Sequence, residues 1–135
     1  MILKYRAWLK QYDVMVDDVT DMTFKEGNLE FIGRRTSNGV SLQYCADDIN
    51  LMQSTGLKDK NGKEIFEGDV IAIEVDDTET PINARVFQNS KIGVLMFHVF
   101  EDNEDVPMVE LLEDNSVAFE IIGNVYENPE MLEVE

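Results

Sequence analysis

Short extended runs of hydrophobic and polar residues dominate the first half of the chain. In the clearest of them, Val40, Leu42 and Tyr44 alternate with Ser41 and Gln43, which is the period of a strand buried on one face. No long segment in this half repeats its apolar residues at the spacing of an amphipathic helix. The pattern therefore predicts a mainly β protein, β-rich α+β at most, with little helix.

Five such runs in residues 1–50 are predicted to form a small antiparallel sheet. They lie at 5–9, 12–16, 19–24, 29–32 and 40–44. Residues 25–28, Lys-Glu-Gly-Asn, make a four-residue loop with an internal glycine, so the third and fourth runs are predicted to form a hairpin. Residues 47–52 are predicted to hold one helical turn capped by an aspartate.

The second half contains the most apolar runs. The run at 70–75 is rich in β-branched residues and apolar on both faces until Glu74, which predicts a strand buried on both sides. Five strands are predicted in this half, at 51–57, 70–75, 82–88, 92–100 and 119–126. By analogy of number and spacing, they predict an SH3-like barrel, a fold that removes most open sheet edges.

The chain is therefore predicted to divide at position 51. Residues 1–50 form an N-terminal β subdomain, which packs on a small C-terminal β-barrel of residues 51–128. Residues 129–135 form a tail after the strand that closes the barrel.

The stretch 51–74 contains a turn that looks like part of a calcium-binding loop. Its Asn61-Gly62 dipeptide predicts positive φ at two successive residues. The sequence from Asp59 to Gly62 also matches the middle of an EF-hand loop. Such a loop needs an acid two places before Asp59 and a glutamate six places after Gly62. Those places hold Leu57 and Gly68, so the turn is predicted to be structural.

Three motifs occur in order along the chain. KYRAW lies at 4–8, TGLKDKNGKEIFEGDVI at 55–71, and IIGNVYENPE at 121–130. Together they closely resemble the YopX family, whose members are encoded by phages and prophages, mainly of Gram-positive bacteria. The resemblance implies a mostly β protein of unknown biochemical role that works in the bacterial host cell. It brings no catalytic or binding residue to this chain.

Charge is distributed unevenly along the 135 residues. The net charge is −17. Residues 1–58 hold seven Lys or Arg and eight Asp or Glu, a net charge of −1. Residues 59–135 hold four Lys or Arg and twenty Asp or Glu, a net charge of −16. Such a half repels nucleic acid and anionic membrane, so no direct binding to either is expected. A basic protein partner is compatible with the negative charge of this half.

Cysteine content and hydropathy indicate the compartment. Cys45 is the single cysteine, so neither an internal disulfide nor a cysteine-cluster metal site is expected. No apolar run approaches the ~20 residues that span a membrane, and the N-terminus lacks the apolar core of a signal peptide. The expectation is a soluble protein of the reducing cytoplasm of a bacterial host.

Few residues are candidates for chemistry. His98, the single histidine, shares a strand face with Val94, Met96 and Phe100, so it is predicted to be a packing or boundary residue. A nucleophilic cysteine needs a nearby base, and Cys45 with His98 is the one such pair the sequence allows. No partner that orients either residue is evident from the sequence.

Clusters of charge give two weaker candidates. The acidic loop at 101–105 offers oxygen ligands for a divalent cation, although its spacing matches no known loop and a solvated surface is the simpler interpretation. Two basic spots, Arg34-Arg35 and the trio Lys58, Lys60 and Lys63, are either solvated turns or contacts to the acidic half of a neighbouring subunit. A head-to-tail contact of that second kind would generate rings.

The sequence thus favours a non-enzymatic protein-interaction or self-assembling module of phage origin. It identifies no catalytic, cofactor-binding or metal-binding residue and predicts no cofactor. Two alternatives stay open: an acidic DNA mimic that inhibits a host nucleic-acid-binding protein, and a hydrolase that uses carboxylates or a divalent metal ion.

Overall fold

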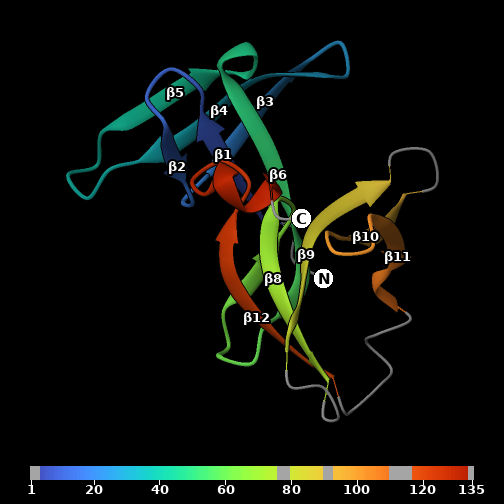
Figure 1. Ribbon diagram of the computed structural model, residues 1–135. Helices are drawn as coiled ribbons and strands as arrows, with labels where there is room; N and C mark the ends of the chain where they lie inside the picture. Colours follow the sequence, from blue (N-terminus) through green and yellow to red (C-terminus); the bar gives the residue numbers. More distant parts are fainter. Residues whose placement is uncertain (1–3, 76–79, 90–92, 110–116, 134–135) are drawn as a thin grey trace. The chain divides into compact units, whose positions relative to one another are not determined.

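Antiparallel strands make up most of the chain in the computed structural model, which describes residues 4–75, 80–89, 93–109 and 117–133 (Figure 1). Helix is limited to short stretches in these residues, so the predicted mainly β class is confirmed. By contacts along the chain, the protein divides into two units, Met1–Ser54 and Thr55–Glu135. Position 92 of the strand expected at 92–100 and positions 134–135 of the expected tail lie outside the described residues.

The strands of the first unit belong to two sheets rather than the single sheet that the sequence predicts. One sheet has the order β2-β1-β6-β7, with β1 (Tyr5–Leu9) between β2 (Val14–Val16) and the start of β6 (Ile49–Lys58). The other has the order β3-β4-β5. These strands span Asp21–Lys25, Asn28–Arg35 and Ser41–Cys45. Strand β6 continues past Ser54 into the second unit, where β7 (Glu64–Phe66) is its neighbour.

The turn between β3 and β4 is tighter than predicted. Lys25 pairs directly with Asn28, so the loop has two residues instead of four. Both loop residues have positive φ, 53° at Glu26 and 83° at Gly27, as in a type I′ hairpin turn. Gly27 takes this conformation without a Cβ clash. The turn sets the register of the two pairs beside it, and an irregularity between Thr23 and Phe24 leaves one extra residue in β4 beyond them.

The core of the first unit is small. Its buried residues are Ala7, Leu9, Val16, Ile32 and Ile49. Across the β3-β4-β5 sheet, Met22, Ile32 and Tyr44 lie side by side and face this core.

The segment before β6 contains less helix than the sequence predicts. A 3₁₀ turn, η1, covers Ala46–Asp48, and no side chain caps it. Ile49 is already extended and pairs with Leu9 of β1. The helical turn predicted over 47–52 is present at Asp47 and Asp48 only. From Ile49 on the prediction is wrong, because pairing with β1 takes these residues into a strand.

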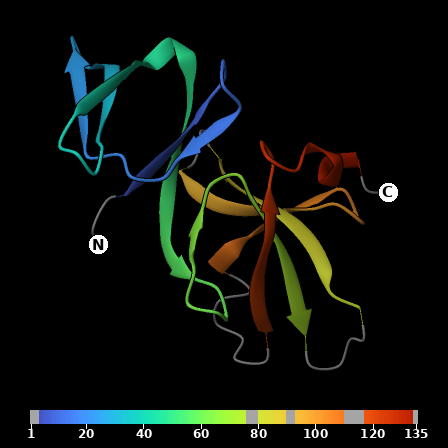
Figure 2. The same ribbon diagram turned by 90° about the vertical axis from the view of Figure 1, so that its left-hand side faces the viewer.

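The second unit is built on a five-stranded antiparallel sheet with the order β11-β10-β9-β8-β12. These strands span Glu104–Pro107, Val94–Val99, Ile82–Asn89, Asp69–Val75 and Val117–Asn124. The run predicted at 51–57 is not a member, since it lies in β6. Its place as fifth strand is taken by Glu104–Pro107, which the sequence assigns to an acidic loop. The sheet curls into a half-barrel (Figure 2), and an SH3-like closure stays a prediction.

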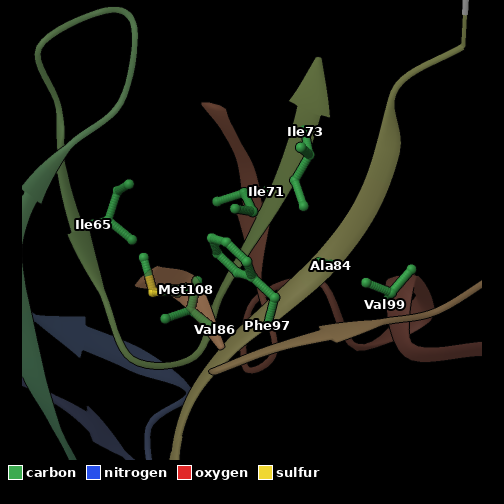
Figure 3. Packing of buried hydrophobic residues seen from close by; sticks show 8 residues of the cluster. All are labelled: Ile65, Ile71, Ile73, Ala84, Val86, Phe97, Val99 and Met108. Carbon is green, nitrogen blue, oxygen red and sulfur yellow. The ribbon is translucent and has the colours of Figure 1, made fainter. Parts of the chain in front are cut away.

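One face of this sheet carries the core of the second unit (Figure 3). Alternate residues of β8, β9 and β10 face it, among them Ile71, Val86 and Phe97, each fully buried. The rings of Phe97 and Phe119 are 5.5 Å apart between centroids and tilted by 45°. A 3₁₀ turn, η2 (Pro129–Glu133), follows β12. Among the described residues, no helix is long and apolar enough to span a membrane.

Candidate functional site

The most distinctive sequence motif, residues 55–71, forms an internal hydrogen-bonded turn. Asp59 is 7% exposed. One carboxylate oxygen accepts from the backbone N–H of Asn61 at 3.0 Å and of Lys63 at 2.9 Å, and the other accepts from Ile121 at 3.1 Å. Gly62 has positive φ (82°) but Asn61 does not, so the prediction of two successive positive φ angles is wrong.

These contacts explain the charge state of Asp59. Burial raises the pKa of its carboxyl, but the three N–H donors, Ile121 first, together hold that pKa below the ordinary value. Three backbone N–H groups thus occupy three of the roughly four acceptor sites of the Asp59 carboxylate. These bonds hold the turn together, and the expectation that it binds no cation stays a prediction.

The closing motif, residues 121–130, is arranged in the same way. Asn124 accepts through Oδ1 from the backbone N–H of Tyr126 at 3.0 Å and of Glu127 at 2.8 Å. Its own N–H donates to Oδ1 of Asn128 at 3.2 Å. The N–H of Val125 donates to the carbonyl of Gly68 at 2.8 Å, which joins this motif to the first. Asp59, Asn124 and Asn128 therefore stabilise the fold through bonds to backbone groups.

His98 is the last residue but one of β10 and contacts Asp105 of the neighbouring strand β11. Its Nδ1 is 2.7 Å from a carboxylate oxygen of Asp105. The rings of His98 and Phe100 are 5.8 Å apart between centroids in a T-shaped arrangement. Arg85 is its pairing partner on the other side, in β9. An aspartate that orients a histidine is one part of a catalytic arrangement, and no nucleophile among the described contacts completes it.

The acidic segment 101–105 is only partly a loop. Its last two residues, Glu104 and Asp105, begin β11, and Asn103 has positive φ (51°) at the turn before it. In the described part of the chain, no three acidic, histidine or cysteine side chains gather closely enough to hold a metal ion.

Cys45 is exposed at the end of β5. It lines a surface cleft of about 290 Å³ in the first unit, together with residues that include Lys25, Phe31 and Asp47. Small-molecule sites usually start at about 300 Å³ and are mostly apolar, so this cleft is small and polar for such a site. Its lining, all within the described residues, includes no histidine.

The basic spots are partly neutralised inside the chain. The guanidinium of Arg34 makes two hydrogen bonds to the carboxylate of Asp18, at 2.9 and 3.2 Å, and this contact lowers the pKa of Asp18. Lys60 bonds Glu74 at 2.9 Å, which raises the pKa of the ammonium group, and Glu120 lies 3.9 Å away. These two cations are therefore already paired within their own units.

An open sheet edge is the feature that sequence reasoning missed. Strand β3 is the outermost strand of the β3-β4-β5 sheet, and all its residues except Met22 are exposed. Phe24 is 60% exposed, an unusual degree for a phenylalanine. The sequence predicts a strand at 19–24, but alternation does not reveal which strand of a sheet has no neighbour.

A family model covers almost the whole chain, and two solved structures have a similar fold. The family model described as "YopX protein" matches residues 4–133. Among solved structures, protein EF1440 from Enterococcus faecalis is 26% identical, with a TM-score of 0.61 and coverage of 98% of this chain and 99% of that one. Protein yopX from Bacillus subtilis is 24% identical, with a TM-score of 0.65 and coverage of 95% and 96%. No curated protein sequence matches this chain.

Proposed function

The chain belongs to the YopX protein family, and we propose that it is a non-enzymatic interaction module that assembles with copies of itself in the cytoplasm of a phage-carrying bacterial host. The observation that carries the proposal is the exposed Phe24 on the open strand β3. Unpaired strand edges are templates for pairing with another chain, and most proteins blunt them. An edge that carries an aromatic side chain is suited to an interface, where aromatic residues are enriched.

The distribution of polar contacts supports the same function. Several polar side chains of the two longer family motifs bond to the backbone of their own unit, as Asp59, Asn124 and Asn128 do. Residues used in this way are not available to bind or convert a substrate. Function is then expected on the surface outside the motifs, where β3 lies.

Light scattering coupled to gel filtration tests the proposal on the full chain. We expect a mass above 15.5 kDa that rises with protein concentration, because self-association follows mass action. A monomer mass across the accessible concentration range, at both low and high salt, would contradict the proposal. The salt series also tests head-to-tail assembly between basic spots and the acidic half, which high salt should dissociate.

The DNA-mimic alternative depends on acids that are available to a partner. Glu74 and Glu120 lie beside Lys60, and Asp59 and Asp69 are buried, so four of the acids in the second unit are poorly suited to mimic phosphates. Displacement of a DNA-binding host protein from labelled DNA by this protein would favour mimicry over self-assembly.

The hydrolase alternative has His98 and Asp105 as its best residues. A panel of ester and phosphodiester substrates, assayed with and without added divalent cations, tests it. Turnover that disappears in His98→Ala would favour an enzyme, and a panel without turnover supports the interaction module.

A further inference from the structure

The geometry of the β3–β4 hairpin determines what β3 presents at its open edge. In a two-residue hairpin, the backbone groups of the flanking pair, here Lys25 and Asn28, face each other. Backbone groups alternate in direction along a strand. Those of Lys25, Thr23 and Asp21 therefore face β4, and those of Met22 and Phe24 face the open edge.

The side chains of β3 are arranged symmetrically about its central residue. Thr23 stands in the middle, with Asp21 two positions before it and Lys25 two positions after it. All three side chains point to the same face, because side chains alternate with a period of two. Met22 and Phe24 flank Thr23 on the opposite face.

We propose that β3 pairs antiparallel with β3 of a second copy, about a twofold axis that passes beside Thr23. This inference rests on the self-assembly proposed above and names its surface. In that register Asp21 lies opposite Lys25 of the second copy, and Lys25 opposite its Asp21. Opposite charges in directly opposed positions stabilise a strand pair, and the symmetry forms the charge pair twice.

The same register gives Phe24 a partner. Residues at equal distances on either side of Thr23 meet, so Phe24 lies opposite Met22 of the second copy. Apolar cross-strand pairs of this kind stabilise sheets, and an aromatic ring beside a methionine sulfur is favourable. The contact covers a side chain that is 60% exposed in the single chain.

The backbone directions agree with this register. Met22 and Phe24, whose backbone groups face the open edge, oppose one another across the axis and form the hydrogen-bonded pairs. Thr23 then forms a non-hydrogen-bonded pair with itself, for which the Cα atoms are about 4.5 Å apart. The two three-stranded sheets join into one continuous sheet.

The other outermost strands among the described residues lack this symmetry. Strands β2 and β5 carry no charged residue, and β7 and β12 each carry a single acid. Strand β11 carries two adjacent acids and ends in a proline, so a second copy of it would meet like charges. Charge complementarity with itself is thus a property of β3 alone among these edges.

A disulfide trap tests the register directly. Thr23→Cys, made in a Cys45→Ser background, should form a covalent dimer under mild oxidation, since ~4.5 Å between Cα atoms is within the range of disulfides. Asp21→Cys in the same background is the matched control, because the two introduced cysteines would lie roughly 13 Å apart along the strand pair. Non-reducing gels give the readout.

Charge reversal provides an independent second test. Asp21→Lys or Lys25→Asp alone should weaken self-association about tenfold or more, because each places two like-charge pairs across the axis. The double variant Asp21→Lys with Lys25→Asp should restore it, since both pairs are again opposite in sign. Circular dichroism of every variant confirms that the fold is retained.

The outcomes separate the interface from the proposed function. If wild type self-associates but Thr23→Cys is trapped no faster than Asp21→Cys, the β3 pairing is overturned and self-assembly stands. The pairing is also overturned if the double charge variant is as weak as the singles. A wild-type protein that stays monomeric, without a trapped Thr23→Cys dimer, overturns both.

Discussion

The carboxylate of Asp59 accepts a hydrogen bond from the backbone N–H of Ile121 at 3.1 Å, across 62 positions of sequence. The two residues belong to the two longest family motifs. A second bond from the N–H of Lys60 to the carbonyl of Phe119, at 2.8 Å, runs beside the first. The motifs therefore form one structural element, in which the turn after β6 is fastened to β12.

Replacement of Asp59 tests how much this element stabilises the protein. Asp59→Ala removes the acceptor of three backbone N–H groups and leaves them without a partner. A hydrogen bond to a charged group contributes about 1.5–3 kcal/mol, and partial hydration of the exposed N–H groups offsets some of the loss. We expect the free energy of unfolding to fall by roughly 2–4 kcal/mol, measured by urea denaturation.

Asp17→Ala is the matched control for this variant. Asp17 is an exposed acid in the first unit, and surface substitutions of this kind change stability by about 0.5 kcal/mol or less. Equal losses in both variants would contradict the role assigned to Asp59.

The same carboxylate makes stability depend on pH in a defined direction. The pKa of Asp59 is lowered in the folded state from the ordinary value of 3.8. Its contribution is therefore fully present above that value and is lost as the pH falls through the lowered folded-state pKa. The pKa of Asp18 is also lowered, chiefly by its hydrogen bond to Arg34, so the contribution of Asp18 to stability is likewise lost at low pH.

The pH effect is measured as a difference between two proteins. Wild type should exceed Asp59→Asn in unfolding free energy at pH 7. The gap should narrow as the pH falls below the ordinary value of 3.8, because the unfolded chain then takes up a proton that the folded carboxylate still excludes. Urea denaturation at pH 7, 4 and 3 provides the comparison. A gap that is constant over this range would show that ionisation of Asp59 does not contribute.

Features set by local sequence could be predicted. The alternation at 40–44 identified β5, whose Leu42 and Tyr44 are half-buried while Ser41, Gln43 and Cys45 are exposed. The alternation of Ile82, Ala84 and Val86 with Asn83 and Arg85 identifies β9 in the same way. A period of two needs no knowledge of distant residues, so short windows of sequence were sufficient.

Features set by distant partners could not be predicted. The segment 51–57 is predicted to be a barrel strand, yet its residues 51–53 pair with β1. The segment 104–107 is acidic, yet it becomes a strand because β10 offers it an unpaired edge. The role of Asp59 depends on Ile121, and the exposure of Phe24 depends on the absence of a neighbour to β3 among the described strands.

Two phenylalanines, one in the core of the second unit and one on the surface of the first, allow a direct comparison of burial. Phe97 is fully buried and stacks near Phe119, whereas Phe24 is 60% exposed in the first unit. Phe97→Ala should lower the free energy of unfolding by about 3–5 kcal/mol through lost burial and a cavity. Phe24→Ala should cost the single chain under about 1 kcal/mol, measured by urea denaturation at low protein concentration. Similar losses for both would contradict this assignment of the core.

Gly123 tests the packing of the closing motif. A Cβ on this residue would lie 2.6 Å from Oδ1 of Asn128 and 3.0 Å from Sδ of Met131. The φ angle of Gly123 is not in the left-handed region, so alanine is acceptable to the backbone and its cost comes from crowding alone. Gly123→Ala should therefore lower the free energy of unfolding by about 1–3 kcal/mol, as overpacking does.

Asn128 determines whether that crowding can be relieved. Its Oδ1 accepts the N–H of Asn124 at 3.2 Å, so it cannot move aside without loss of this bond, whereas Met131 is flexible. Asn128→Ala removes the atom nearest to the added Cβ. The double variant with Gly123→Ala should then be more stable than the sum of the two single losses predicts, by about 0.5 kcal/mol or more. Strictly additive losses, measured by urea denaturation of all four proteins, would show that the methyl group disturbs another part of the motif.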